Sequence, residues 1–376
     1  MTLSTIESPL AEAHRQLGAT LGVYHGVLVP SRFTGPTLEH AAARWASGLF
    51  DFSFRGKLAV KGPDRTSFLH NMLSNDVKRL APGEGTYATL LDIKGHILAD
   101  PRVYCADEVL IVDTDADLAE KVRQHLDRFI LMDEVEVEPL PLFAIAIQGP
   151  KSREWLETVL DFHVPLPDEF RHATTSVTAG TVRVVRATST GDEGYELWAE
   201  TPVLGALWKA ALATLPATGM RPCGTEALET LRIQAGIPRY GAELDEETLP
   251  LEAGLLNALS FNKGCYPGQE IIERARSRGH VNWKLAGLVV DGGTPPARGE
   301  KLVREGKEVG EVTSAGFCPT VSPAGGPTGG RILALAYLRR EAAEPGTKLA
   351  LSSGAPAEVH ELPFWPSREQ GTGNRE

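Results

Sequence analysis

The chain has 376 residues, more than a single hydrophobic core usually supports, so we expect two or three domains. Hydrophobic residues make up 42% and charged residues 23%, which excludes a fibrous or wholly disordered chain. The formal net charge of -11 would repel a phosphate backbone, so we expect neither general nucleic-acid binding nor attraction to an anionic membrane.

Helical and extended patterns alternate in the first third of the chain. Apolar residues recur at helical spacing in residues 38–50, 65–73 and 115–129, and Asp64 stands where a helix N-cap is expected. Short apolar runs separated by turn residues fill residues 83–113 and predict antiparallel strands. We therefore predict a compact α+β domain over residues 56–138, inserted into another domain.

The middle third repeats this mixture of helices and strands. Residues 143–147, 182–186 and 195–198 have the character of strands, and residues 151–160, 203–215 and 225–235 have the character of helices. Together with the N-terminal segment they predict a discontinuous α+β domain made of residues 1–55 and 139–280.

Beyond Trp283 the helical signal ends, and short β runs separated by Gly and Pro turns predict a small all-β barrel over residues 281–366. Residues 319–330 are rich in Gly and Pro and predict a mobile loop, and residues 367–376 predict a disordered tail.

The four cysteines lie far apart, without a C-x-x-C pair, so the sequence predicts neither a zinc ribbon nor a run of cluster ligands, and we expect no metal site. The first residues have no basic and apolar leader, and no run approaches the roughly 18 apolar residues of a membrane span. We expect a cytoplasmic protein with reduced thiols.

The sharpest motif is K-G-C-Y-P-G-Q-E at residues 263–270. Two glycines and a proline predict a tight loop leading into a short helix, where amide dipoles and Lys263 would favour the thiolate of Cys265. The alternative is a small buried hydrophobic cysteine. No histidine adjoins Cys265 to act as its base.

This motif resembles the K-G-C-Y-x-G-Q-E signature of the YgfZ family, folate-binding relatives of the glycine-cleavage T-protein. Residues 190–196, T-G-D-E-G-Y-E, resemble the T-G-E-x-G-Y-E turn of that superfamily, and residues 231–238 and 249–255 resemble the helix and loop before the signature. Residues 95–100, G-H-I-L-A-D, resemble its acidic G-G-x-x-D-D segment, with Asp100 as the one aspartate left.

The resemblance implies three domains around a central tetrahydrofolate cavity, with a C-terminal barrel. It assigns the reading of the pterin ring to Glu196, whose carboxylate could accept paired hydrogen bonds. Read from the residues alone, Glu196 could instead be an exposed strand carboxylate, Asp100 a turn residue, and Arg274 part of a solvated helix end. The resemblance makes Cys265 and Asp100 the catalytic candidates, and the expected folate contacts are Asp100, Tyr195, Glu196, Lys263, Gly264, Gln269 and Arg274.

Three functions are compatible with these residues. The first is a tetrahydrofolate-binding protein that assists assembly or repair of iron–sulfur enzymes, with Cys265 at the cavity and iron–sulfur proteins as partners. The second is a folate-dependent aminomethyltransferase, or a demethylase of glycine derivatives. The third is a folate-gated scaffold without turnover. The motif at Cys265 and the single aspartate in residues 95–100 favour the first.

Overall fold

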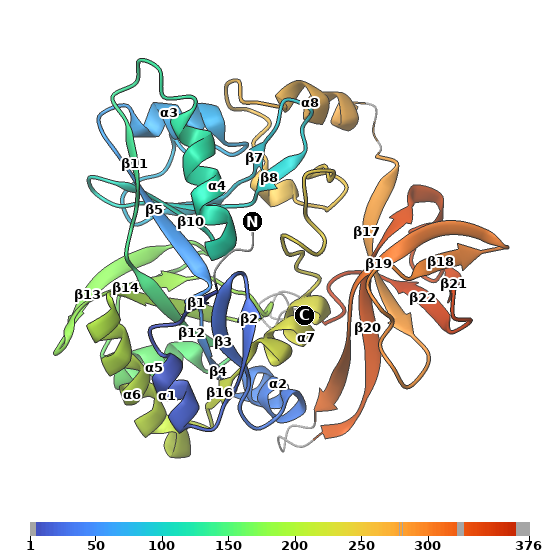
Figure 1. Cartoon of the computed structure of the whole chain (residues 1–376), viewed down its shortest axis with the longest axis horizontal. Helices are drawn as coiled ribbons and strands as arrows, with labels where there is room; N and C mark the ends of the chain where they lie inside the picture. The colour runs from blue at the N-terminus through green and yellow to red at the C-terminus, as the bar shows by residue number, and fades with distance from the viewer. Residues whose placement is uncertain (1–4, 278, 280, 322–326, 366–376) are drawn as a thin grey trace, which may run out of the picture.

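The structure is a computed structural model that describes residues 5–277, 279, 281–321 and 327–365. Three sheets and a closed barrel make up most of it (Figure 1). The predicted combination of an α+β body with a C-terminal β-barrel is confirmed. Within the described residues, no helix combines the length and the apolar character needed to cross a membrane.

The N-terminal segment forms a small sheet that sequence patterns did not predict. Its strands pair in the order β1-β3-β2, and β2 and β3 form a hairpin through His25 and Gly26, which both have positive φ. The elements of this segment are β1 (Ile6–Glu7), α1 (Ala11–Gln16), β2 (Thr20–Tyr24), β3 (Val27–Arg32) and α2 (Pro36–Trp45).

A six-stranded sheet, ordered β13-β14-β15-β12-β4-β16, forms the first α+β unit. Trp155 and Trp208 of its covering helices pack with Leu197 in the core. Its elements are β4 (Gly48–Asp51), β12 (Phe143–Gln148), α5 (Ser152–Val159), β13 (His172–Val177), β14 (Gly180–Arg186), β15 (Gly194–Ala199), α6 (Thr201–Thr218), β16 (Arg221–Cys223) and α7 (Thr225–Ala235).

The prediction of one helix over residues 38–50 is wrong beyond Trp45. The chain turns there and enters β4, where Phe50 pairs with Ala146 on one side and Cys223 on the other. A central position between two strands buries every residue of β4, so tertiary pairing overrides the local helical pattern.

The second α+β unit is a five-stranded antiparallel sheet in the order β11-β5-β10-β9-β6. Asp64 occupies the N-cap position of α3, as predicted, but its side chain makes no capping hydrogen bond. Its carboxylate instead accepts a hydrogen bond from the backbone N–H of Glu134. The elements are β5 (Arg55–Lys61), α3 (Arg65–Met72), β6 (Gly85–Tyr87), β9 (Arg102–Cys105), β10 (Leu110–Asp115), α4 (Ala116–Asp127) and β11 (Glu136–Pro139).

The segment that follows α7 packs against a two-stranded hairpin of the second unit. Leu91 and Ile97 of this hairpin share a core with Leu244, Tyr266 and Ile272. The elements are β7 (Leu90–Leu91), β8 (Ile97–Ala99), η1 (Leu256–Ala258) and α8 (Gln269–Ser277). Figure 1 shows α8 beside β7 and β8.

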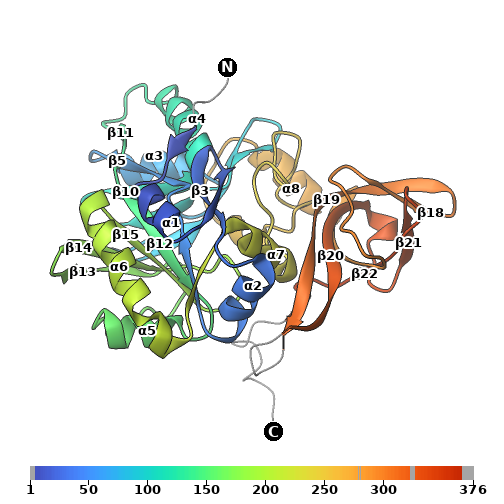
Figure 2. The same cartoon turned by 60° about the horizontal axis from the view of Figure 1, so that its bottom comes forward.

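The barrel closes in the order β17-β20-β19-β18-β21-β22 and stands to one side of the other units (Figure 2). The predicted loop over residues 319–330 is wrong at both ends, since Cys318 pairs with Arg331 and the ladder continues through Thr320 and Gly329. The middle of that loop and the predicted tail lie outside the described residues. The elements are β17 (Trp283–Val290), β18 (Lys301–Arg304), β19 (Lys307–Val321), β20 (Pro327–Arg339), η2 (Arg340–Ala342), β21 (Lys348–Leu351) and β22 (Pro356–His360). The limits of the three domains, residues 1–55 with 139–280, 56–138 and 281–366, stay a proposal.

Candidate functional site: a central cavity

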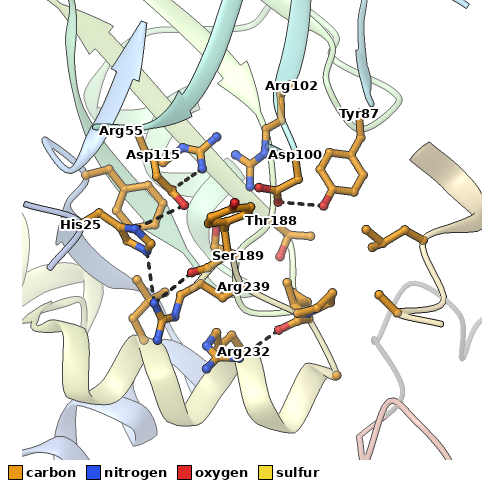
Figure 3. A pocket seen from close by; sticks show the side chains of 18 of the residues that line it. His25, Arg55, Tyr87, Asp100, Arg102, Asp115, Thr188, Ser189, Arg232 and Arg239 are labelled. Carbon is orange, nitrogen blue, oxygen red and sulfur yellow. Dashed lines mark hydrogen bonds and ion pairs between the residues drawn. The ribbon is translucent and has the colours of Figure 1, made fainter. Parts of the chain in front are cut away.

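A cavity of about 360 Å³ lies where the N-terminal hairpin, the two α+β sheets and the segment after α7 meet. Strand β9, the turn before it and β5 supply part of its polar wall, with Asp100, Arg102 and Arg55 (Figure 3). Its volume lies within the usual range for small-molecule sites. Parts of the chain far apart in sequence therefore form one concave site.

Asp100 is a carboxyl group of this cavity whose pKa lies well above its ordinary value. Burial, together with the nearby Asp115 carboxylate, raises the pKa of Asp100 to about 6. The hydroxyl of Tyr87 donates a hydrogen bond of 2.9 Å to Asp100 Oδ2. A carboxyl group with a near-neutral pKa can hold or release a proton at physiological pH, which suits acid–base or charge-stabilising work.

Strand register builds the charged wall behind Asp100. Asp113 of β10 lies opposite Lys57 of β5 and Arg102 of β9, and Asp115 lies opposite Arg55. Because side chains two apart on a strand share a face, these charges meet on one side of the sheet. Arg55 reaches Asp113 Oδ2 and Asp115 Oδ1, each at 2.7 Å, and Lys57 Nζ lies 3.2 Å from Asp113 Oδ1. The network fixes the guanidinium of Arg55 in the cavity wall.

The side chain of Glu196, on β15 of the six-stranded sheet, is held in part by Arg102 of the five-stranded sheet. Its side chain is fully buried, so the alternative of an exposed strand carboxylate is wrong. Arg102 Nη1 lies 2.7 Å from Glu196 Oε1, and the indole N–H of Trp198 donates a 2.8 Å hydrogen bond to Glu196 Oε2. Glu196 is not among the described residues that line the cavity, whereas Arg102 is. In this structure Glu196 acts on the cavity through Arg102.

The tip of the N-terminal hairpin forms another part of the wall. His25 has φ of 45°, a conformation that non-glycine residues adopt at a cost and that is frequent at functional sites. Its Nδ1 lies 3.4 Å from Asp115 Oδ2 and 3.3 Å from Asp117 Oδ1, while Arg239 Nη1 lies 3.4 Å from its Nε2 (Figure 3). His25, Asp115 and Asp117 could together offer metal ligands. Arg55 and Arg239 place two positive charges there, so we assign these residues to an ion-pair network.

The sequence patterns missed His25, Arg55 and Arg239 as site residues. The signal for the hairpin was present in His25-Gly26 between two apolar runs, because a residue that tolerates positive φ followed by glycine suits a two-residue turn. The charged ladder gave no local signal, since its pairing depends on strand register.

The side chain of Lys263, in the signature loop of residues 263–270, contacts the backbone at the end of α3. Its ammonium group donates hydrogen bonds to the carbonyl oxygens of His70, Leu73 and Asn75, at and just beyond the helix C-terminus. A cation there stabilises the end of a helix. Burial lowers the pKa of Lys263 to about 8.

Gly268 joins the signature loop to the hairpin that leads into Asp100. It has φ of 79°, and a Cβ atom at this position would lie 2.5 Å from the carbonyl oxygen of Asp92 and 2.8 Å from Gly95 Cα. Only glycine allows such a close approach of two backbones. The loop therefore supports β7 and β8, and through them the position of Asp100.

The remaining predicted residues are spread over the surface and the body. Cys265 is exposed, which excludes the buried alternative, and Gly264 and Arg274 are exposed as well. Gln269 begins α8, and the hydroxyl of Tyr195 donates to Glu193. Of the predicted site residues, only Asp100 is among the described residues that line the cavity. This corrects the expectation that the Cys265 loop opens onto it; the loop is held instead by Lys263 and Gly268.

The cavity has the features that a pterin-bearing ligand requires. The rings of Tyr87 and Phe170 lie 6.5 Å apart at 27°, which gives an aromatic wall for a flat ring. Asp100 can pair with ring N–H groups, and Arg232 and Arg239 lie in the wall where a ligand carboxylate could reach them. The residues present therefore fit a folate.

Comparison with known proteins agrees with this geometry. The model of the GCVT N-terminal domain matches residues 10–263, and that of the glycine cleavage T-protein C-terminal barrel domain matches residues 284–366. The aminomethyltransferase of Rubrobacter xylanophilus is 33% identical over 361 residues, covering 95% of this chain and 94% of that protein. The aminomethyltransferase of Halothermothrix orenii is 31% identical over 363 residues, covering 95% and 99%.

Among solved structures, the glycine cleavage system aminomethyltransferase T from Bartonella henselae superimposes with a TM-score of 0.84 at 25% identity, covering 96% of this chain and 99% of that one. The resemblance to the T-protein superfamily is thus confirmed, whereas the finer assignment to the YgfZ branch stays a prediction. The chain belongs to the glycine-cleavage T-protein family.

Proposed function

We propose that this protein transfers a one-carbon aminomethyl unit to tetrahydrofolate in the central cavity. Aminomethyltransferases use tetrahydrofolate, so the predicted cofactor is confirmed for the family. The observation that carries the proposal is the carboxyl group of Asp100, with its pKa raised to about 6, in a cavity shared by sheets far apart in sequence. This reverses the preference drawn from the sequence, because the full-length relatives are aminomethyltransferases.

The folate, when bound, supplies the nitrogen atoms that accept the one-carbon unit. The chain's own residues would position the folate and polarise its reacting atoms. Asp100 would stabilise positive charge that develops near it or hold a proton at its carboxyl oxygen. Tyr87 fixes the carboxyl group by its hydrogen bond, and Arg55 keeps the Asp115 carboxylate in place. Such fixed charges need no reorganisation during the reaction.

The test is product formation by the purified protein. Incubation with tetrahydrofolate and a lipoyl-linked aminomethyl donor should yield 5,10-methylenetetrahydrofolate, and Asp100→Asn should reduce the rate by about 100-fold or more. The exposed Asp133→Asn, outside the cavity, serves as the control and should keep the full rate. Folate binding without product from this donor would refute the proposal.

A second candidate is the maintenance of iron–sulfur enzymes, with those enzymes as partners and Cys265 as the working thiol. Its support is the exposure of Cys265 within the motif that resembles the YgfZ signature. Cells that lack the protein should regain the activity of cluster-dependent enzymes with the wild type but not with Cys265→Ala. Equal recovery with both would exclude this candidate. We also propose a cytoplasmic location, because the four cysteines are free thiols, as is typical of a reducing compartment.

A further inference from the structure

A second cavity, of about 220 Å³, lies where helices α2 and α7 meet the barrel strands β19 and β20. It shares no lining residue with the central cavity among the described parts of the chain. Its volume falls below the roughly 300–1,000 Å³ typical of sites for drug-sized ligands, so its ligand would be small. The proposed aminomethyl transfer gives this cavity no role.

A buried histidine without a complete set of partners points to a ligand. His40 is 1% exposed, and its Nε2 shares a 3.1 Å hydrogen bond with Gln234 Oε1. Burial lowers the pKa of His40 to about 4, so the ring is neutral at physiological pH. If Nε2 carries the proton, Nδ1 is an acceptor, and this atom has no hydrogen-bond partner in the described structure. Buried polar atoms are normally paired, so a donor belongs there.

The charge of the wall favours an anion. Arg44 and Arg331 line the cavity, and no acidic side chain is among its described lining residues. Arg44 already pairs with Asp192. Arg331 is exposed and makes no ion pair with any residue that the structure describes. In a chain with a net charge of -11, this is a local positive site that can attract a negative group.

Aromatic side chains supply another part of the walls. Trp45, Phe364 and Trp365 line the cavity together with His360. The rings of His360 and Phe364 lie 6.4 Å apart, and the guanidinium of Arg44 lies 5.3 Å from the centre of the Trp365 ring. Flat walls of this kind favour stacking with a planar ring. A single ligand satisfies all three features if it combines a flat ring, a ring N–H and a negative group.

We propose that this interdomain cavity binds a small heteroaromatic anion. The ring N–H donates to His40 Nδ1, the negative group pairs with Arg331, and the ring face packs on Phe364 and Trp365. Because helices of the first α+β unit and strands of the barrel form opposite walls, such a ligand would connect these two parts of the molecule.

The probe is indole-3-acetate, which carries a ring N–H and a carboxylate, and binding is measured by titration calorimetry with the full-length protein. We expect saturable one-to-one binding that Arg331→Gln weakens by about tenfold, the loss of one charge-assisted contact. Arg340→Gln removes an exposed arginine of the same barrel that lies outside the cavity and should leave binding unchanged. A melting curve of each variant checks that it is folded.

The ring N–H is tested with 1-methylindole-3-acetate, which lacks it and should bind about tenfold more weakly. His40→Phe should abolish the preference between the two probes. Saturating 5-formyltetrahydrofolate should not displace indole-3-acetate, since the two cavities are separate. The proposal is overturned by absence of saturable binding, by equal affinity of wild type and Arg331→Gln, by equal affinity for both probes, or by displacement by the folate.

Discussion

Asp100→Asn should make the protein more stable while strongly lowering its rate of aminomethyl transfer. A rise in the pKa of this carboxyl from 3.8 to about 6 means that the folded chain holds the charged form at a cost of about 3 kcal/mol above pH 6. Since water enters the cavity, we expect about 1–3 kcal/mol of stabilisation from the neutral amide. Asparagine keeps an acceptor for the Tyr87 hydroxyl, so that hydrogen bond survives.

The size of this effect depends on pH. Below about pH 4 the carboxyl group is protonated in both the folded and the unfolded chain, and wild type and variant should be equally stable. Between about pH 4 and 6 the folded chain binds more protons than the unfolded one, so wild-type stability relative to Asp100→Asn falls as the pH rises. Above about pH 6 the difference is constant.

Urea denaturation at a series of pH values measures this difference directly, with Asp133→Asn as the exposed control. Two results would refute the claim that the surroundings of Asp100 disfavour its charged form. One is an Asp100→Asn variant less stable than wild type at pH 7.5, and the other is a stability difference that does not change with pH.

Three other substitutions test the parts around the cavity. Gly268→Ala should destabilise the protein by about 1–3 kcal/mol in denaturant titrations. Gly264→Ala is the control and should be neutral, because its Cβ would have no neighbour closer than 4.0 Å. Equal effects of the two substitutions would contradict the argument that only glycine allows the close approach at position 268. Cys265→Ser should leave the dissociation constant of 5-formyltetrahydrofolate unchanged in calorimetry, because Cys265 does not line the cavity, and a large loss of affinity would place the thiol at the ligand. Glu196→Gln removes the buried carboxylate that pairs with the half-buried Arg102, and it should cost about 3–5 kcal/mol in thermal or urea unfolding. Loss of folate binding at full stability would instead indicate direct contact with the pterin.

Local patterns predicted correctly those helices and strands whose apolar spacing matches the secondary structure that they form. Helix α7 begins and ends where its apolar spacing and the following Gly236 predict, and the barrel follows from short β runs separated by turns. The errors lie where long-range pairing decides. Residues 48–51 have a helical pattern but are buried between two strands, and residues 319–321 extend β19 because β20 pairs with them.

The site shows the same division. Resemblance to the family identified Asp100, and the structure places it in the cavity wall. The ladder of Arg55, Asp113 and Arg102 could not be read from the chain, because it depends on which strands pair and in which register. The position of the Cys265 loop was equally hidden, since it depends on the contact of Gly268 with a hairpin some 170 residues earlier.

The central claim is that folate binds in the cavity beside Asp100. A crystal structure of the complex with 5-formyltetrahydrofolate tests it most directly. We expect the pterin ring between the N-terminal hairpin and the five-stranded sheet, with one of its polar atoms within hydrogen-bonding distance of the Asp100 carboxyl group. Ligand density at the 263–270 loop or at the barrel, with none beside Asp100, would contradict the account.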